Sequence, residues 1–379
     1  MTTPSRRKTL FVPGPTEVRD EILAEMSRPM IAHRHADFTA LCREIFPKLP
    51  ALFGTKNRVM VATGSATGLM EAALRNTVRR RALCLVSGAF GERWKDIAKL
   101  NGVPHDALEV EWGKAIRGDA VRAALAKADY DAVTLIHNET STGVMNPLAE
   151  IAAAVREGKP DALFLVDTVS SLGGVPIDVD RHGIDVCLAG VQKALALPPG
   201  LVLFSASERT FARAESIPNR GYFLDFLDYR KFHDKFSTPS TPAVSIFYAL
   251  RRQLERIEHE TFARRFERHR EMAGIVRAWA AARFALFAEK GYESETLTCV
   301  ENTRGADLDA LSAHLAENGM AIADGYGPLK GKTFRIAHMG DLTPGEVRGL
   351  LARIDAFLGA SGPAAAAAGA AGASGRTAR

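Results

Sequence analysis

Features that define several large classes of protein are scarce in this sequence. Its 379 residues include four cysteines, which lie far apart and form no Cys-x-x-Cys pair. This spacing indicates neither a zinc site nor a disulfide framework, so we expect a reducing compartment. No apolar run is long enough to span a bilayer. The start, MTTPSRRKTLFVPGP, carries charge but no apolar core before Pro13, which argues against a secretory signal and predicts a cytoplasmic protein.

Charge of one sign is not concentrated in any part of the chain. The formal net charge is +5, and acidic residues interleave with basic ones almost throughout. We find no aromatic and basic face of the kind that grips single-stranded nucleic acid, so we predict no nucleic-acid partner. A mild positive excess suits small anionic substrates or a cofactor phosphate. His33 and His35 flank an arginine without a nearby carboxylate pair, and we therefore predict no metal site.

Short apolar runs alternate with helical patterns through the first half of the chain. The runs cover residues 58–63, 82–87, 131–138, 162–169, 183–190 and 201–206. They are rich in Val, Leu and Ile and do not alternate with polar residues, which is typical of strands buried on both faces. The pattern predicts an α/β fold with a large, mostly parallel sheet flanked by helices.

The pattern changes after Ser237. A proline-punctuated loop leads into a long helical stretch from about residue 246 to about residue 289, and a smaller α+β unit follows. We predict an N-terminal segment (1–16), a large domain (17–260) and a small C-terminal domain (261–358). The remaining residues, 359–379, are an Ala/Gly-rich tail that has nothing to bury, and we expect this tail to be disordered.

Glycines and polar residues gather directly after several runs, where ligands bind in open parallel sheets. TGSATG (63–68) joins a strand to a helix, and its N–H groups could hold a phosphate, although many such turns use Gly and Ser only for geometry. HNETSTG (137–143) is either a plain polar loop or a set of partners for an oxygen-rich ligand. The chain has no GxGxxG after its first strand, which argues against a nicotinamide-dependent oxidoreductase.

Asp167 and Lys193 are the charged residues that most need an explanation. Asp167 follows four apolar residues, where a carboxylate is costly unless a positive group or a helix cap compensates for its burial. Lys193, in GVQKALALPPG (190–200), lies 193 − 167 = 26 residues later, which is about one αβ unit. If the two strands are neighbours, both side chains face one pocket. A buried lysine has a lowered pKa and forms Schiff bases. Pyridoxal phosphate needs such a lysine, a carboxylate for its pyridinium nitrogen and a phosphate site.

Eight segments of the chain resemble class V aminotransferases of the fold-type I pyridoxal-phosphate enzymes, in the alanine/serine–glyoxylate aminotransferase branch. The segments are 11–18, 63–74, 87–94, 137–148, 166–180, 190–200, 237–250 and 332–341. The resemblance implies a seven-stranded type of sheet, a small α+β domain, pyridoxal 5'-phosphate as cofactor and a homodimer with shared active sites. The implied reaction is a ping-pong Schiff-base transfer of an amino group. A small amino acid such as alanine or serine gives that group to a 2-oxo acid, glyoxylate or pyruvate.

The same resemblance assigns roles to individual residues. Lys193 would form the Schiff base and act as general acid and base, and Asp167 would pair with the pyridine nitrogen. The other cofactor-binding positions are Ser65, Ala66 and Thr67 at the phosphate, Phe90 stacked on the ring, Thr140 near the phenolic oxygen, Gln192 beside the lysine, and Thr238 and Thr241 at the neighbouring subunit's phosphate. Arg335, Pro13 and Gly14 fall at substrate-binding positions, and Arg335 would clamp the α-carboxylate with a bidentate pair.

Three positions depart from the family pattern. Phe90 stands where Trp is common, Thr67 where some members have His, and Thr238 where some have Tyr. These changes leave the chemistry intact and the choice of amino acid open.

Other functions stay open at this point. 2-Aminoethylphosphonate–pyruvate transaminase has a similar HxETxTG loop. Cysteine desulfurase would need a mobile catalytic cysteine, whereas Cys299 lies in an expected strand. A catalytically silent homologue that acts as a binding protein is the alternative from a different class, and the intact Lys193 and Asp167 argue against it.

Overall fold

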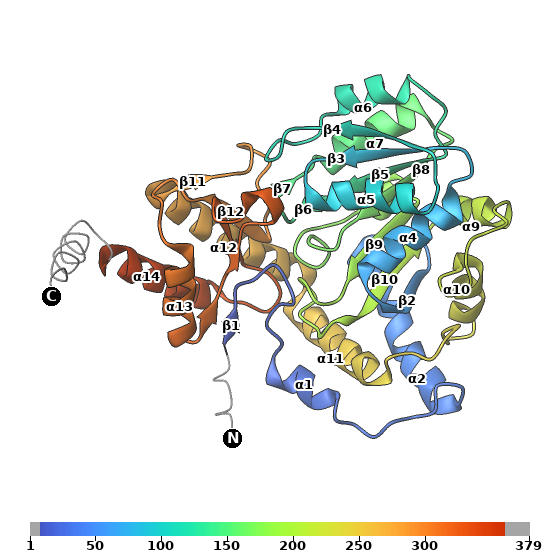
Figure 1. Ribbon diagram of the computed structural model, residues 1–379. Helices are drawn as coiled ribbons and strands as arrows, with labels where there is room; N and C mark the ends of the chain where they lie inside the picture. Colours follow the sequence, from blue (N-terminus) through green and yellow to red (C-terminus); the bar gives the residue numbers. More distant parts are fainter. Residues whose placement is uncertain (1–7, 361–379) are drawn as a thin grey trace, which may run out of the picture.

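A seven-stranded sheet forms the centre of the computed structural model, which describes residues 8–360 (Figure 1). Its spatial order is β2-β10-β9-β8-β5-β3-β4. The strands are β2 (Val59–Gly64), β3 (Ala82–Val86), β4 (His105–Glu109), β5 (Ala132–Ile136), β8 (Leu163–Asp167), β9 (Val186–Gly190) and β10 (Gly200–Ala206). Neighbours from β9 to β4 pair in parallel, whereas β10 is antiparallel to both β9 and β2. The predicted mostly parallel sheet is confirmed.

Both faces of this sheet are covered by apolar packing. Along β8, Phe164 and Val166 belong to one hydrophobic cluster, whereas Leu163 and Leu165 belong to the other. The covering helices are α2 (Ala36–Ile45), α3 (Leu49–Phe53), α6 (Gly118–Leu125), α7 (Leu148–Gly158), α8 (Val179–His182) and α11 (Val244–Glu260) on the first cluster, and α4 (Ala66–Thr77), α5 (Ala89–Leu100), α9 (Glu208–Glu215) and α10 (Phe226–His233) on the second. Burial on both faces explains why the strands read as unbroken apolar runs, since each buried large side chain contributes about 1.5–3 kcal/mol.

A second, smaller unit follows α11. Its antiparallel sheet has the order β11-β12-β15-β14, with β11 (Ala285–Leu286), β12 (Leu297–Glu301), β15 (Thr333–Ala337) and β14 (Ala323–Asp324). Helices α12 (Phe262–Arg283), α13 (Leu308–Glu317) and α14 (Pro344–Ala360) pack around a separate hydrophobic cluster. None of the helices in the described part of the chain has the length and apolarity needed to cross a membrane.

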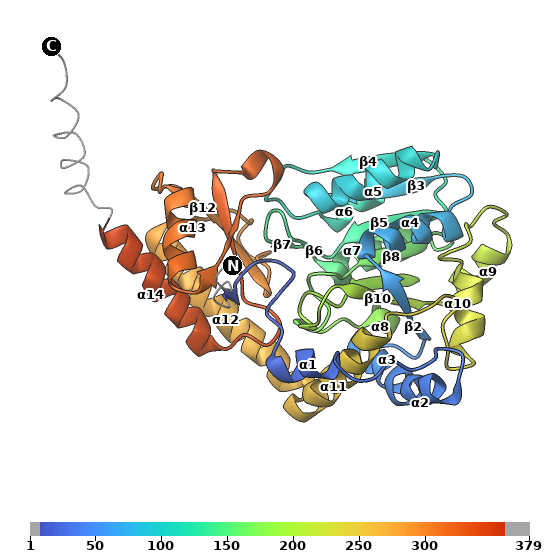
Figure 2. The ribbon, with the colours of Figure 1, turned by 60° about the horizontal axis from the view of Figure 1, so that its bottom comes forward.

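The N-terminal segment connects the two units. Strand β1 (Thr9–Leu10) pairs in parallel with β13 (Met320–Ala321) of the small unit, and α1 (Asp20–Glu25) lies against α11 (Figure 2). The shorter elements are the 3-10 helices η1 (Phe46–Lys48) and η2 (Gly327–Leu329) and the hairpin of β6 (Asn138–Glu139) and β7 (Val144–Met145).

The single helical stretch expected over residues 246–289 is wrong. It consists of α11 and α12, which are separated at Thr261, where φ is +69°. The left-handed backbone ends the first helix, and the Thr261 side chain accepts the N–H of Arg264 and so begins the second. Helix α12 then ends at Arg283. The break at Thr261 lies beside the domain boundary predicted after residue 260, which stays a prediction.

Two other expectations differ from the structure. Strand β4 was not expected, because it is an edge strand with the polar sequence HDALE and several partly exposed residues. The disordered tail was expected from residue 359, but α14 continues to Ala360. Residues 361–379 lie outside the part of the chain that the structure describes.

Candidate active site

One cavity of about 180 Å³ brings together most of the residues that the sequence singled out. Its lining includes Ser65, Ala66, Thr67, Phe90, Thr140, Asp167, Gln192 and Lys193. The same lining adds Met70, Arg93, Ile136, Asn138, Val169 and Ser170. These residues come from the ends of β2, β5, β8 and β9 and from the first turns of α4 and α5, as expected for a ligand site in this type of sheet.

Asp167 is the last residue of β8, and its side chain is 6% exposed. Strand β8 neighbours β9, so Asp167 lies in register with Leu188, five residues before Lys193. Burial raises the pKa of Asp167 to about 7, the negative charge of Glu139 adds to this, and the Val169 N–H opposes it by donating to Oδ1 at 2.8 Å. Within residues 8–360, the other carboxylate oxygen has no hydrogen-bond partner. A cation placed beside this carboxyl group would therefore be strongly stabilised.

Lys193 lies in the turn that follows β9. Burial lowers the pKa of Lys193 to about 8, the positive charge of Arg335 lowers it further, and Asp167 opposes both. The amine donates a hydrogen bond to the carbonyl oxygen of Pro13. Gly14 has φ +110°, and a Cβ there would lie 2.6 Å from the Lys193 side chain. Pro13 and Gly14, predicted as substrate-binding residues, therefore lie directly against the lysine.

The start of α4 supplies hydrogen-bond donors to the same cavity. Ser65 is its N-cap residue, but its hydroxyl makes no capping hydrogen bond. Ala66 and Thr67 are the first two helical residues, whose N–H groups have no partner within the helix. These groups can bind an anion, and the helix dipole adds to the attraction.

Glu139 positions the aromatic wall of the cavity, a role that the sequence reasoning missed. This carboxylate is fully buried and accepts the N–H groups of Phe90 and Gly91 at 3.1 Å each. It also accepts the N–H and the hydroxyl of Ser141, at 3.1 and 2.6 Å. Burial raises the pKa of Glu139, and these four donors oppose the shift. The first turn of α5, and with it the Phe90 ring, is thereby held in place. The only signal in the sequence was a carboxylate within HNETSTG.

Two arginines lie beside this aromatic wall without a carboxylate partner among the described residues. Arg93 lies over the Phe90 ring at 4.6 Å and donates to the hydroxyls of Thr67 and Tyr326, at 3.3 and 3.4 Å. Arg335, on β15, is 8% exposed and donates to the carbonyl oxygens of Asp324 and Thr140 at 3.0 and 3.4 Å. Because only neutral acceptors contact these guanidinium groups, their charge is available to an anionic ligand.

The polar loop after β5 (137–143) forms a further part of the cavity wall. The hydroxyl groups of Thr140 and Ser170 lie 2.5 Å apart. Asn138 donates to the Ser170 carbonyl at 3.0 Å and to the Thr296 hydroxyl at 2.9 Å. The buried Oδ1 of Asn138 has no partner in the described part of the chain. Of the two interpretations of HNETSTG, the structure favours a set of partners for a polar ligand.

The structure does not bring every predicted residue to this cavity. The hydroxyl of Thr238 donates to the Ser240 carbonyl at 2.8 Å, and Thr241 is exposed. Arg34 holds this loop through the carbonyl oxygens of Thr238 and Pro239, at 2.5 and 2.6 Å. Neither threonine lines the cavity of its own chain.

The remaining histidines and cysteines offer no second site. His35 precedes α2 without capping it, and no group of three His, Cys, Asp or Glu side chains within residues 8–360 is placed to hold a metal ion. His338 is buried against the Thr298 hydroxyl, and burial lowers its pKa to about 3. Cys299 lies on β12, as expected, and burial raises its pKa to about 11. A buried thiol of this kind is a poor nucleophile, which argues against cysteine desulfurase.

The chemistry of these residues fits pyridoxal phosphate. The cavity offers an amine, a carboxylate with an oxygen free to pair, an aromatic wall and a helix start with open N–H groups. The orphaned Oδ1 of buried Asn138 is a further acceptor for a polar ligand. Nicotinamide cofactors would use neither the lysine nor the position of Asp167.

The chain is similar to known aminotransferases in both sequence and structure. A family model described as aminotransferase class-V matches residues 16–328. An uncharacterized aminotransferase of Methanocaldococcus jannaschii is 39% identical over 359 residues, which is 93% of each chain. A serine–glyoxylate aminotransferase of Methylorubrum extorquens is 31% identical over 91% of this chain and 90% of its own. The crystal structure of ureidoglycine–glyoxylate aminotransferase from Bacillus subtilis has a TM-score of 0.87 and 31% identity, covering 94% of each chain.

Proposed function

This chain belongs to the class V aminotransferase family, and from that membership we propose that it transfers the amino group of a small amino acid, such as alanine or serine, to glyoxylate or pyruvate. The observation that carries the proposal is the single cavity shared by Lys193 and Asp167, next to the open start of α4. The serine–glyoxylate and ureidoglycine–glyoxylate relatives support glyoxylate as the acceptor.

The cofactor in this proposal is pyridoxal phosphate. When bound, it supplies an electron sink for the negative charge that develops at the Cα atom of the amino acid. Asp167 would hold the pyridine nitrogen and Phe90 would stack on the ring. The other residues that would hold the cofactor are Ser65, Ala66 and Thr67 at the phosphate, and Thr140 and Gln192 at its polar edge.

Lys193 would both anchor the cofactor and move protons. Because burial lowers the pKa of Lys193 to about 8, an appreciable fraction of its amine is neutral near pH 7. The neutral Nζ can take the proton from Cα of the donor, and the resulting ammonium form would deliver that proton to the cofactor carbon that carries the transferred amino group. In the cofactor-free protein, the carbonyl oxygen of Pro13 accepts a hydrogen bond from this Nζ atom.

Arg335 would orient the substrate for this proton transfer. Its guanidinium group has only carbonyl partners, so a substrate α-carboxylate can form a bidentate pair without displacing an ion pair. The ring of Tyr326, 5.5 Å from the guanidinium carbon, supports the side chain from one side. This pairing fixes which Cα substituent faces Lys193.

A donor screen tests the proposed reaction. Alanine, serine, aspartate and 2-aminoethylphosphonate are each supplied with pyridoxal phosphate and either glyoxylate or pyruvate, and the product amino acids are quantified. We expect alanine or serine to be used, and Arg335→Gln to raise their KM by about 10–100-fold, because a charge-assisted pair contributes about 1.5–3 kcal/mol. Arg348→Gln, on the exposed face of α14, is the control and should match the parent. Use of 2-aminoethylphosphonate alone would favour the phosphonate transaminase, and no turnover would favour a silent homologue.

We further propose that two copies of the chain share each active site. Thr238 and Thr241 do not reach the cavity of their own chain, whereas Ser65 and Thr67 at the phosphate position are exposed. A second hollow, of about 450 Å³, adjoins Ser65 and is bordered by Tyr222 and Phe223. These two aromatic residues are 92% and 53% exposed, which suits burial by a partner.

Sedimentation tests the shared site. We expect a particle of twice the 41.0 kDa chain mass. The double variant Tyr222→Ser/Phe223→Ser should dissociate and bind pyridoxal phosphate more weakly, because the partner's threonines are lost. A parent protein that sediments as a monomer and still transaminates would contradict the proposal.

We also propose a cytoplasmic location. The four cysteines are all buried and unpaired, which suits a reducing compartment.

A further inference from the structure

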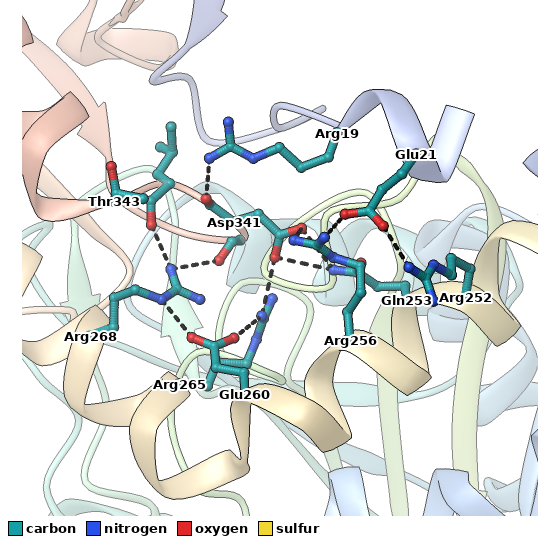
Figure 3. A network of polar contacts seen from close by, with 12 residues as sticks. Arg19, Glu21, Arg252, Gln253, Arg256, Glu260, Arg265, Arg268, Asp341 and Thr343 are labelled. Atoms are coloured by element: carbon teal, nitrogen blue, oxygen red, sulfur yellow. Dashed lines mark hydrogen bonds and ion pairs between the residues drawn. The ribbon is translucent and has the colours of Figure 1, made fainter. Parts of the chain in front are cut away.

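A network of arginines and carboxylates lies where α1, α11, α12 and the loop after β15 meet (Figure 3). It borders a hollow of about 660 Å³, larger than the candidate active site. Most of its ion pairs are partly exposed, but Arg265 and Asp341 are 1% and 8% exposed. Arg265 is therefore the buried centre of the network.

The guanidinium group of Arg265 contacts both structural units. Toward the large unit, Nε donates to the carbonyl oxygen of Gly173 at 3.0 Å, and Nη2 donates to that of Ala194 at 2.6 Å. The remaining nitrogen, Nη1, donates to Glu260, at the end of α11, at 2.8 Å and to Asp341, in the loop after β15, at 3.1 Å. The planar fork of an arginine allows one group to make all four contacts.

Three of these four contacts lead to a residue of the candidate active site, and the fourth, Glu260, lies at the end of α11. Ala194 is the residue after Lys193, in the turn that follows β9. Gly173 belongs to the loop that begins at Asp167. Asp341 lies in the loop that follows β15, six residues after Arg335.

Asp341 is itself held firmly. Gln253 donates to both of its carboxylate oxygens, at 3.2 and 3.1 Å, and Arg256 lies 3.6 Å away. His269, one turn after Arg265 on α12, accepts the N–H of the neighbouring Gly340 at 3.1 Å. The loop after β15 therefore cannot shift without moving the partners of Arg265.

We propose that Arg265 is a positioning residue that keeps the Lys193 turn and the Asp167 loop in register with the strand that carries Arg335. The inference rests on the proposed transamination, since it concerns how the proton-moving amine is aligned with the residue that clamps the substrate. Misplacement by about 1 Å at such a site can cost 10²-fold in rate. Arg265 is not among the residues that line the candidate active site, and it acts through the backbone carbonyl groups of Ala194 and Gly173.

Arg268 provides a matched control on the same helix. It contacts Glu260 at 2.6 Å and the carbonyl oxygens of Gly340 and Leu342 at 3.0 and 2.5 Å. It therefore shares the acidic partner and the loop after β15 with Arg265. Unlike Arg265, it makes no hydrogen bond to Gly173 or Ala194 within the described residues.

The test compares Arg265→Lys with Arg268→Lys in the full-length protein. Lysine keeps the positive charge beside the carboxylates but cannot span the four acceptors. We expect Arg265→Lys to lower kcat by about 10-fold or more with little change in the KM of the amino donor, and Arg268→Lys to stay within about twofold of the parent. The unfolding temperature of each variant is measured as well, and kcat is compared well below the lower of the two, which separates misalignment from a general loss of stability.

Hydrogen exchange of the cofactor-free protein gives a readout independent of activity. Peptides covering residues 168–174 and 190–197 should exchange faster in Arg265→Lys and remain unchanged in Arg268→Lys. Equal kcat and equal exchange in the two variants would overturn the positioning role. If the parent neither binds pyridoxal phosphate nor transaminates, the proposed function fails, and the exchange comparison alone decides whether Arg265 holds these loops. Should Arg265→Lys not fold, Asp341→Ala, which removes the acceptor of only one arm of the link, is expected to lower kcat in the same direction, and parent-like kcat would overturn the proposal.

Discussion

Replacing Lys193 with alanine is expected to abolish transamination, with kcat falling by at least about 10⁴-fold. The change removes both the covalent anchor and the group that moves the Cα proton, and general acid–base catalysis alone contributes about 10²–10⁴-fold. The cavity itself should survive, because the side chain contributes only an amine that bonds to the Pro13 carbonyl. The measurement is kcat with the best donor, together with the absorbance band of bound pyridoxal phosphate, which Lys193→Ala should lack.

The pH dependence of cofactor uptake checks that Lys193 is the reacting amine. Burial lowers the pKa of Lys193 from the usual 10.5 to about 8 in the cofactor-free protein. Below this pH the amine is protonated and cannot attack an aldehyde, so the rate of uptake should rise with a midpoint near pH 8. The exposed Lys127→Ala is the control and should behave as the parent. Parent-like activity or uptake in Lys193→Ala would rule out the assigned role.

Replacing Asp167 with asparagine is expected to lower kcat by about 10²-fold or more while stabilising the cofactor-free fold at alkaline pH. The loss of activity follows because a buried cation left without its carboxylate costs about 3–5 kcal/mol. The gain in stability concerns the cofactor-free protein. There the Asp167 carboxylate is buried without a full set of partners, and asparagine removes this buried charge.

The sign of the stability effect can be worked out from the pKa. Burial raises the pKa of Asp167 from 3.8 to about 7, so between these values the folded protein binds a proton that the unfolded chain releases. The contribution of Asp167 to the free energy of unfolding therefore falls as pH rises from 4 to 7, by up to roughly 4 kcal/mol. Asparagine is always neutral and avoids this loss. The difference between variant and parent should be largest above pH 7 and vanish near pH 4.

Urea unfolding of the cofactor-free proteins at both pH values measures this difference. Glu208→Gln, at the exposed start of α9, controls for the removal of any carboxylate. If Asp167→Asn keeps full activity, the carboxylate is not the partner of a cofactor nitrogen. If it is no more stable than the parent at alkaline pH, the unpaired carboxylate in the empty cavity is not destabilising.

Sequence patterns predicted the elements whose formation depends on residues that are neighbours along the chain. The apolar runs located β2, β3, β5, β8, β9 and β10, and the spacing of Asp167 and Lys193 placed both at one sheet edge. The polar edge strand β4 was not predicted, because its side chains are partly exposed and its sequence contains no apolar run. The break at Thr261 was not predicted, because nothing in the surrounding charged helical stretch indicates that this residue has a positive φ.

Residues that act through distant backbone groups could not be found in this way. Glu139 holds the N–H of Phe90, and Arg265 holds the carbonyl oxygen of Ala194, which is 71 residues away in the chain. Glu139 is marked in the sequence only by its place within HNETSTG, and nothing in the immediate neighbours of Arg265 distinguishes it from a surface charge. Only the fold shows that they support the cavity. Thr238 and Thr241 were assigned to the neighbouring subunit's phosphate, and their place outside the cavity of their own chain leaves that assignment a prediction.

The path of the first described residues sets an order on how the active site can be assembled. Thr9 and Leu10 pair with Met320 and Ala321, and the N–H of Thr16 then donates to the Gln192 carbonyl at 3.0 Å. The segment between them carries Pro13 and Gly14 across Lys193. Residues 9–16 precede the strands of the large sheet in the chain, whereas their strand partner, Met320–Ala321, follows all of them. Until that partner has been made, the β1 pairing that anchors this segment beside Lys193 cannot form, even though every strand of the large sheet is already present.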